Sequence, residues 1–302
     1  MALVITNCGK RKRVPVDPTL HAAKLASASS DTVASDWSQR LTTAEPTTPV
    51  EHLYAGRAFY EAVRTAKALS APLAVVSAGL GLVDGRTRVP SYSLTTVARD
   101  PDNILNRTGS LGPEWWSVIR ARSPFHSTAP EREDGVILAA LSSGYLSMVA
   151  PEWADWPRER LARLRLFTKA LPASLPDALA EAWMPYDDRL EALGNGHAGT
   201  LGDFAPRAMR HFAENIFGEG DQASDRAAVL ESLEGLTPPN IPTRTRHTDE
   251  EIKVMIGTHW DLLEGRSAAM LRHLRDTLGV ACEQKRFQGL FAEVAGARRA
   301  LA

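Results

Sequence analysis

The stretch Leu3-Val4-Ile5-Thr6-Asn7-Cys8-Gly9-Lys10 decides the fold, because a short apolar run rich in β-branched residues ends there in small and polar residues. The same pattern returns at Leu73–Gly85, and a helical pattern spans Tyr54–Leu69 between the two. Buried parallel strands are nearly continuous apolar runs, and ligands bind beyond their carboxyl ends. The sequence therefore predicts a strand, a helix and a strand of an α/β sheet, with a site at the strand ends.

Later segments extend the predicted sheet. Gly135–Leu141 is a third apolar run, followed by Ser142-Ser143-Gly144, and Leu161–Thr168 predicts a fourth strand. A helix is predicted to begin near Asp203, since Asp is a good N-cap and Pro206 fits a first turn. The predicted fold class is α/β, a mainly parallel sheet with flanking helices, together with a small helical C-terminal domain.

The predicted domain organisation follows changes of composition along the chain. Residues 1–217 form the α/β domain, residues 218–247 a linker rich in Pro, and residues 248–302 a helical domain that begins with a capping box, Thr248-Asp-Glu-Glu251. Residues 14–50 are rich in Ala, Ser, Thr, Asp and Pro. We expect them to be an insertion or a poorly ordered lid.

Net charge, cysteine content and the length of the apolar runs limit which partners and which cellular compartment we expect. The 302 residues carry a net charge of −1, so any attraction to nucleic acid has to come from local basic patches. The cysteines Cys8 and Cys282 lie far apart, and no Cys or Cys/His spacing predicts a zinc site. With no signal peptide and no apolar run of about twenty residues, we expect a cytoplasmic protein without a membrane partner.

The segment Ser77–Asp84 bears on cofactors and on catalysis. It is neither a Walker loop nor a dinucleotide fingerprint, which argues against an NTPase or a dehydrogenase, and no cofactor or metal is expected. Asp84 at its end is the candidate carboxylate, able to activate water or to stabilise a positively charged sugar. The alternative is a turn aspartate beside Gly85.

The first predicted strand is followed by a cysteine and four basic residues. Cys8 would be a nucleophile if the basic residues favoured its thiolate, whereas the alternative is a small buried cysteine that packs the turn. The basic run Lys10, Arg11, Lys12 and Arg13 lies directly beyond a strand, so we expect it to contact phosphate rather than form a solvated face.

Aromatic and charged residues elsewhere form further candidate sets. Tyr54 and Tyr92 could stack on a base, or be ordinary half-buried tyrosines. The set Asp187, Asp188, His197, Asp203, Arg207 and His211 has no metal-ligand spacing, which favours a buried ion-pair network. Positive charge on the last two predicted helices is typical of a groove reader or of a charged bundle exterior. It comes from Arg266, Arg272, His273, Arg275, Lys285 and Arg286.

Three motifs together resemble a known family. Ile5–Lys10, Leu53–Gly56 with Phe59, and Val76–Val83 with Pro90-Ser-Tyr92 are similar to a bacterial and phage domain related to the YaaA DNA-binding proteins and to a domain of archaeosine-synthesising enzymes. This resemblance covers residues 1–170 and implies a uracil-DNA-glycosylase-like fold that acts on nucleobases. The remaining part resembles anti-phage DNA glycosylases that excise glucosylated hydroxymethylcytosine.

The resemblance implies roles for individual residues. Asn7 and Cys8 would line the base pocket, Lys10 would meet a phosphate, and Ser77 and Gly79 would form the opposite wall. Leu80 departs from the family pattern, which has a lysine or an aromatic residue there. The expected catalytic residues are Asp84, Asn7 and Asp188, and the remaining substrate-binding residues are Tyr54, Tyr92, Ser142, Asp203 and Arg207.

The function expected from the sequence is N-glycosidic hydrolysis of a modified base in phage DNA. Domain 1–217 would recognise and excise the base, and the helical domain would bind DNA through Arg272, Arg275, Lys285 and Arg286 together with Arg11, Lys12 and Arg13. Two alternatives stay open: a base-modifying transferase on tRNA or DNA that uses Cys8 or an aspartate covalently, and a non-enzymatic DNA-binding protein. The oligomeric state is not predicted.

Overall fold

The computed structural model describes residues 2–132, 134–194, 196–218, 220–238 and 243–301. The chain divides into two compact units, Met1–Pro238 and Pro239–Ala302.

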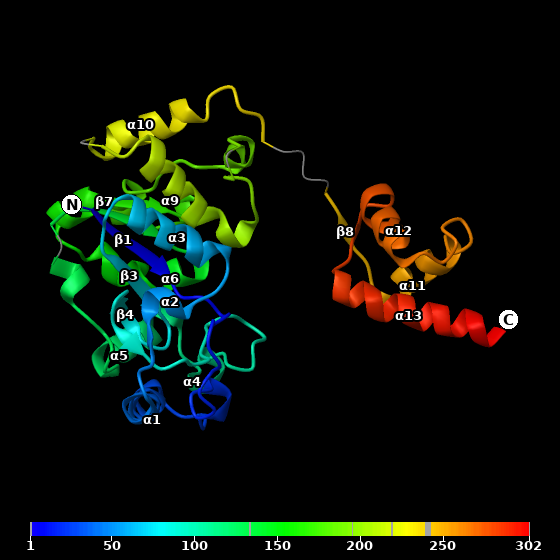
Figure 1. Ribbon diagram of the computed structural model, residues 1–302, viewed down its shortest axis with the longest axis horizontal. Helices are drawn as coiled ribbons and strands as arrows, with labels where there is room; N and C mark the ends of the chain where they lie inside the picture. Colours follow the sequence, from blue (N-terminus) through cyan, green and yellow to red (C-terminus); the bar gives the residue numbers. More distant parts are fainter. Residues whose placement is uncertain (1, 133, 195, 219, 239–242, 302) are drawn as a thin grey trace. The chain divides into compact units, whose positions relative to one another are not determined.

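The first unit is built on a five-stranded sheet in the order β4-β3-β1-β6-β7 (Figure 1). Its strands are β1 (Ala2–Asn7), β3 (Leu73–Ser77), β4 (Gly81–Asp84), β6 (Val136–Ala140) and β7 (Leu164–Phe167). All neighbours are parallel except β4, which pairs antiparallel with β3. The prediction of an α/β fold with a mainly parallel sheet is confirmed.

Helices connect the parallel strands and cover the sheet. From β1 the chain moves to β3 through α3 (Arg57–Ala68), and from β6 it moves in the opposite direction to β7 through α6 (Ser143–Ala154). Right-handed crossovers in opposite directions place these two helices on opposite faces. α9 (Phe204–Asn215) packs on α3, whereas α5 (Gly112–Arg122) packs on α6 and on α1 (Ser30–Thr43).

Shorter elements complete the first unit. They are β2 (Thr48–Pro49), α2 (Val50–Leu53), β5 (Arg88–Val89), α4 (Leu105–Thr108), α7 (Arg158–Arg163), α8 (Asp177–Ala180) and α10 (Gln222–Ser232), with 3-10 turns at Ala22–Lys24, Ala129–Arg132, Pro172–Ser174, Asp188–Ala192 and Leu201–Asp203.

The expectation of a poorly ordered lid at residues 14–50 is wrong. This segment contains α1, whose Trp37 is fully buried and donates its indole N–H to the Gly79 carbonyl at 2.7 Å. Leu41 of the same helix is also fully buried. The small and polar residues of this segment therefore surround an apolar helix face that belongs to the core.

The first unit extends beyond residue 217. α10 is joined to β7 by a buried ion pair, in which Arg165 Nε lies 2.5 Å from Asp225 Oδ2. Val229 and Leu233 are buried in the same core, so the structure ends the first unit at Pro238, inside the predicted linker. Residues 239–242 of that linker lie outside the described residues.

The second unit has its own small core. Its elements are β8 (Thr245–Arg246), α11 (Asp249–Thr258), α12 (Ser267–Arg272), a π-helical turn at His273–Thr277, β9 (Val280–Ala281) and α13 (Gln284–Leu301). Ile252, Ile256 and Phe287 are among its buried residues. Thr248 and Glu251 form the capping box at the start of α11.

Candidate functional site

A cleft of about 830 Å³ lies at the carboxyl ends of β1 and β6. The strand order diverges there, because the chain proceeds from β1 to β3 on one side and later places β6 on the other. Such a switch point is where open α/β sheets bind ligands, and the volume suits a small-molecule site. The lining comprises Thr6–Lys10, Ala55–Phe59, Val97, Leu141–Ser143, Lys169, Thr200–Asp203, Ala205 and Pro206.

Asn7 forms part of the cleft floor. Its Oδ1 accepts the backbone N–H of Ser142 at 2.9 Å, and its Nδ2 donates to the Cys8 carbonyl at 3.0 Å. The side chain therefore ties the ends of β1 and β6 together. Asn7 and Ser142 both line the cleft, as expected from the sequence. Both ends of the Asn7 amide are hydrogen-bonded to backbone groups, so this side chain holds the backbone in place.

Among the residues that the structure describes, three cationic side chains line the cleft, and each has an acidic partner. Lys10 pairs with Asp100, and Lys169 pairs with Asp188. The third, Arg57, lies at the start of α3, and its Nε is 3.2 Å from Glu61 Oε1. The three cationic groups that an anionic ligand would contact are therefore already held in position by their ion pairs.

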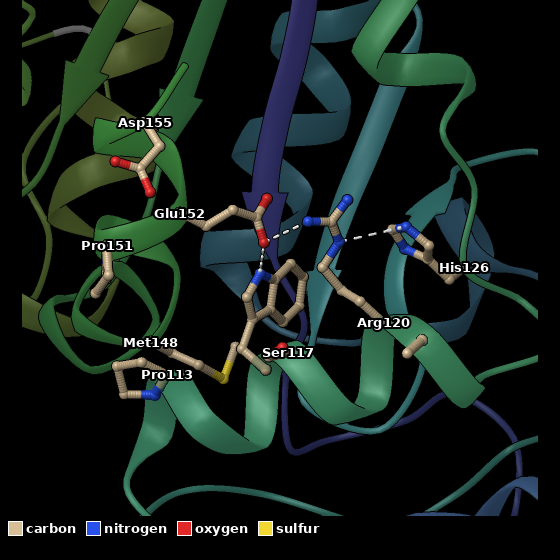
Figure 2. A pocket seen from close by; sticks show the side chains of 10 residues that line it. Pro113, Ser117, Arg120, His126, Met148, Pro151, Glu152 and Asp155 are labelled. Atoms are coloured by element: carbon tan, nitrogen blue, oxygen red, sulfur yellow. Dashed lines mark hydrogen bonds and ion pairs between the residues drawn. The ribbon is translucent and has the colours of Figure 1, made fainter.

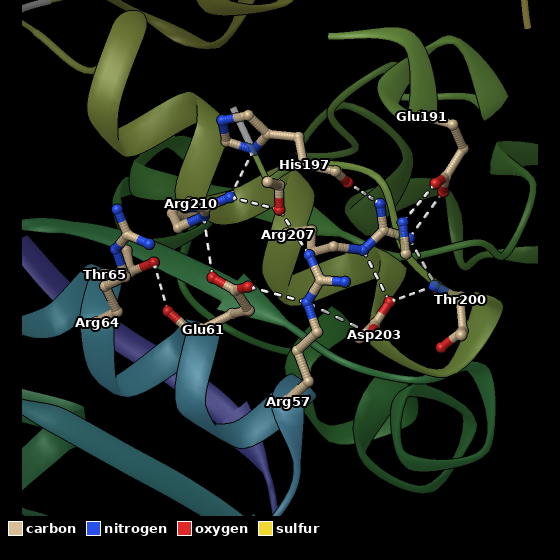
Figure 3. A network of polar contacts seen from close by, with 12 residues as sticks. Arg57, Glu61, Arg64, Thr65, Glu191, His197, Thr200, Asp203, Arg207 and Arg210 are labelled. Carbon is tan, nitrogen blue, oxygen red and sulfur yellow. Dashed lines mark hydrogen bonds and ion pairs between the residues drawn. The ribbon is translucent and has the colours of Figure 1, made fainter. Parts of the chain in front are cut away.

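Asp203 supplies a carboxylate to the cleft lining (Figure 3). It is 6% exposed, and its Oδ1 accepts both the Thr200 backbone N–H and Arg207 Nε at 2.7 Å. Its Oδ2 lies 3.9 Å from Arg57 Nε. One carboxylate oxygen is thus held by the protein, and the other faces a weaker, longer contact.

Arg207 belongs to a buried network and is not placed to touch a ligand. Its side chain is fully buried, lies 2.8 Å from Glu191 Oε1 and donates to the Thr200 and His197 carbonyls. Arg210 extends the network by pairing with Glu61 at 2.9 Å (Figure 3).

Of the predicted set, His197, Asp203 and Arg207 lie in this network. Asp187 and Asp188 are half exposed and pair with Arg189 and Lys169, and His211 is hydrogen-bonded to Tyr186. Among the described residues, no group of three or more potential metal ligands occurs.

The network predicts a loss of stability in acid. Burial and the Arg210 guanidinium lower the pKa of His197 to about 4, with smaller contributions from His211, Arg207 and Arg64. Since the unfolded chain binds the proton more tightly, the unfolding free energy should fall by about 2–3 kcal/mol as the pH drops from 6.5 to 4. Urea unfolding at pH 7 and pH 4.5 measures this loss of unfolding free energy. The loss should be smaller in His197→Gln than in the wild type, whereas His52→Gln, a change at an exposed histidine, should lose as much as the wild type does. Equal losses in all three proteins would contradict this assignment.

Cys8 lies at the inner end of the cleft. It is 5% exposed, and its Sγ is 2.9 Å from the Tyr145 hydroxyl. Burial, followed by the nearby Cys8, raises the pKa of Tyr145 well above its ordinary value, so this phenol stays protonated. The thiol is thus hydrogen-bonded and nearly buried, but it borders the space that a ligand would fill.

The structure does not place Tyr54, Tyr92, Ser77 or Gly79 on the cleft wall. All four are buried behind it: the Tyr92 hydroxyl lies 2.7 Å from that of Tyr54 and 2.5 Å from Ser77 Oγ. A Cβ at Gly79 would lie 2.6 Å from the Tyr92 ring, so glycine is needed for this packing. The two tyrosines therefore fill the core and offer no stacking surface.

The basic run after β1 divides by position. Lys10 is exposed and lines the cleft, and Arg11 and Arg13 are also exposed. Lys12 turns inward, donating to the Gly9 and Lys10 carbonyls, and burial lowers its pKa. Phosphate contact is therefore open to Lys10, Arg11 and Arg13, whereas Lys12 holds the turn.

The expected catalytic aspartates Asp84 and Asp188 are not in the cleft. Asp84 ends β4, and because β4 runs antiparallel, Asp84 lies opposite Ala74 at the amino end of β3, on the other edge of the sheet. Its Oδ1 accepts the Arg86 N–H, as a turn aspartate does. Asp188 is half exposed and reaches the cleft only through its ion pair with Lys169. Asp84 is therefore not the carboxylate of this cleft, contrary to the expectation, and its contact is that of the alternative, a turn aspartate.

The second unit carries a basic pocket of about 470 Å³. It is lined by Arg244, Arg246, Arg275 and Arg286, with Ala281, Cys282 and Glu283. Arg275 is held by the Cys282 carbonyl, and Arg286 by Asp249. Of the expected DNA-binding residues, Arg275 and Arg286 thus come together, whereas Arg272 and Lys285 are exposed outside the pocket. Arg244 and Arg246 were not among the predicted residues, although their spacing of two places them on one face of an extended segment.

Another pocket, of about 520 Å³, lies between α5 and α6 (Figure 2). Trp116 donates its indole N–H to Glu152 at 2.6 Å, and Arg120 pairs with the same carboxylate. Burial and Arg120 lower the pKa of His126, whose Nδ1 accepts the Leu82 N–H, to about 4. These polar groups satisfy one another, so the cleft beside β1 is the stronger candidate.

The fold and the cleft define an α/β protein with a cleft at the switch point of a mainly parallel sheet, the place where folds of this class bind ligands. Comparisons with protein-family models, with curated proteins and with solved structures found no match for the chain. No helix in the described part of the chain is both long enough and apolar enough to cross a membrane.

Proposed function

We propose that the protein is a DNA N-glycosylase that removes a modified base, the substrate class being a base such as glucosylated hydroxymethylcytosine in phage DNA. The observation that carries the proposal is the cleft itself, whose lining contains a single carboxylate, Asp203, among the described residues. The target nucleotide would leave the duplex and enter the cleft, as enzymes that act on a base require. A volume of about 830 Å³ leaves room for a base with a sugar attached.

Asp203 replaces Asp84 as the proposed catalytic carboxylate. In the hydrolysis the C1′–N bond breaks, its electron pair leaves with the base, and a water oxygen bonds to C1′. The carboxylate stabilises the positive charge that develops on the sugar and passes a water proton toward the leaving base. The contacts from Thr200 and Arg207 hold Oδ1, which leaves Oδ2 to receive the water.

The basic pocket of the second unit is the proposed anchor on the DNA backbone. Arg246 is exposed, and Ala substitution should weaken binding to every DNA sequence and reduce the slope of log K against log salt by about one. Fluorescence anisotropy at several salt concentrations measures both quantities. Arg299→Ala, an exposed arginine of α13 outside the pocket, is the matched control and should leave the slope unchanged. Equal slopes for the two variants would contradict the assignment.

The function is tested by incubating the full-length protein with unmodified, hydroxymethylated and glucosylated phage DNA. Mass spectrometry then detects released bases, and alkali-induced strand breaks count abasic sites. A free modified base with matching abasic sites supports the glycosylase and names its substrate. DNA that is bound and stays intact contradicts it and favours a non-enzymatic binding protein.

A base-modifying transferase is the second candidate, favoured by the position of Cys8 at the cleft. A covalent protein–DNA adduct that forms in the wild type and in Cys282→Ser, and is lost in Cys8→Ser, would support this function. Cys282 is the matched control because it is a buried cysteine of the second unit.

A further inference from the structure

Two helices, α3 and α6, begin among the residues that line the cleft. α3 starts after Gly56, whose φ is +110°, and α6 starts after Ser142. The carbonyls of Gly56 and Ser142 accept the N–H groups of Tyr60 and Leu146, but within the described residues no N-cap side chain accepts a hydrogen bond at either helix start. The first N–H groups of a helix have no partner within it, and they attract anions. In α1 and α10, by contrast, Ser29 and Asp221 accept such a bond.

Thr6 gives an independent indication of a ligand. It is 3% exposed, lies on β1 and lines the same cleft. Among the described residues its hydroxyl has no hydrogen-bond partner, whereas the neighbouring side chain of Asn7 has two and that of Cys8 has one. The Thr6 oxygen is not among the fully buried unpartnered atoms of the described residues, so it opens into the cleft and is available to whatever fills that space.

The charge around the cleft matches an anion with several oxygen atoms. Lys10, Lys169 and Arg57 line it, and Asp203 stands on the α9 side, where Oδ1 is already committed. Two helix starts, a hydroxyl and these cations offer more donors than a single carboxylate could accept. A phosphate group has enough acceptor oxygens, and the remaining volume accommodates its sugar and base.

We propose that the cleft binds the phosphate group of a nucleotide at the starts of α3 and α6, with Thr6 as a further donor. This inference rests on the proposed function in that the nucleotide is the one whose base would be removed. The phosphate belongs either to a free nucleotide or to a nucleic acid backbone.

Calorimetry on the full-length protein with deoxycytidine 5′-monophosphate, deoxycytidine and inorganic phosphate tests the site. The monophosphate should bind about tenfold or more tightly than the nucleoside, and inorganic phosphate should compete with it. Ser143→Pro removes the first N–H of α6, and the extended backbone of Ser142, with ψ of 154°, suits a residue before proline. This variant should lose about tenfold in affinity for the monophosphate alone, whereas Ser143→Ala keeps the N–H and should bind as the wild type does.

A second pair guards against misfolding of the proline variant: Thr6→Val should weaken monophosphate binding, and Thr6→Ser should retain it. Equal binding of nucleoside and monophosphate, or equal binding by both members of each pair, would overturn the inference. A single-stranded oligonucleotide that displaces the monophosphate identifies a backbone phosphate, whereas failure to displace it identifies a free nucleotide.

Base release measured in parallel separates this site from the proposed function. Release without a preference for the monophosphate refutes the phosphate site and leaves the glycosylase standing. Tight monophosphate binding without base release from any DNA refutes the glycosylase and leaves the phosphate site standing.

Discussion

Asp203→Asn is expected to reduce base release about 10²- to 10⁴-fold, the effect typical of losing a general base or a charge that stabilises the transition state. The amide keeps the shape of the side chain and can still accept the Thr200 N–H, so the cleft should persist. Single-turnover release of the modified base, followed by mass spectrometry, measures the loss. DNA affinity should change little, because the second unit carries the proposed anchor.

Two controls separate catalysis from folding. Glu191→Gln weakens the other carboxylate partner of Arg207 without altering the cleft lining, and it should leave base release within about threefold of wild type. Asp84→Asn lies on the opposite edge of the sheet and should have no effect. If Asp203→Asn were as active as these two variants, Asp203 would not be the catalytic carboxylate.

Arg165→Ala should lower the unfolding free energy by about 3–5 kcal/mol, the largest effect on stability that we expect. The exposed fractions of the Arg165 and Asp225 side chains are 2% and 9%, so removing the guanidinium leaves a buried carboxylate without its partner. The same guanidinium also donates to the carbonyls of Ala162 and Gly220. Urea denaturation of the full-length protein measures the loss.

An exposed pair provides the comparison. Arg122 and Asp31 are 2.9 Å apart with exposed fractions of 41% and 69%, and Arg122→Ala should cost less than about 1 kcal/mol. Replacing both members of the buried pair, as Arg165→Met with Asp225→Leu, should recover much of the loss. A double variant as unstable as Arg165→Ala would show that the cost lies elsewhere, in the contacts of the guanidinium with backbone.

The positions of the parallel strands along the chain could be predicted, because each strand is a short apolar run that ends at a polar residue. β3, β6 and β7 fall within the predicted runs, and β1 begins one residue before its run, at Ala2. The candidate residues Asn7 and Ser142 meet at the carboxyl ends of the parallel strands β1 and β6. Asp84 was misplaced because the run that ends there contains two strands. Gly81, with φ of +79°, begins β4 after a turn, and β4 returns the chain to the other edge.

The environment of individual side chains was less predictable. Tyr54, Tyr92 and Ser77 come from separate segments and satisfy one another inside the core, a fact that depends on packing rather than on spacing. Asp203 was identified as a helix cap and as a substrate-binding residue, but its approach to Arg57 depends on the packing of α9 on α3. Long-range contacts of this kind leave no local pattern in the sequence.

The separate cores of the two units have an optical consequence. Six of the seven tryptophans belong to the first unit, and Trp260, stacked on Phe291 with ring centroids 5.0 Å apart, belongs to the second. The intrinsic fluorescence of the chain therefore reports mainly on the first unit. Trp260→Phe would make that signal specific to the first unit, and the emission lost by this change is the spectrum of the second.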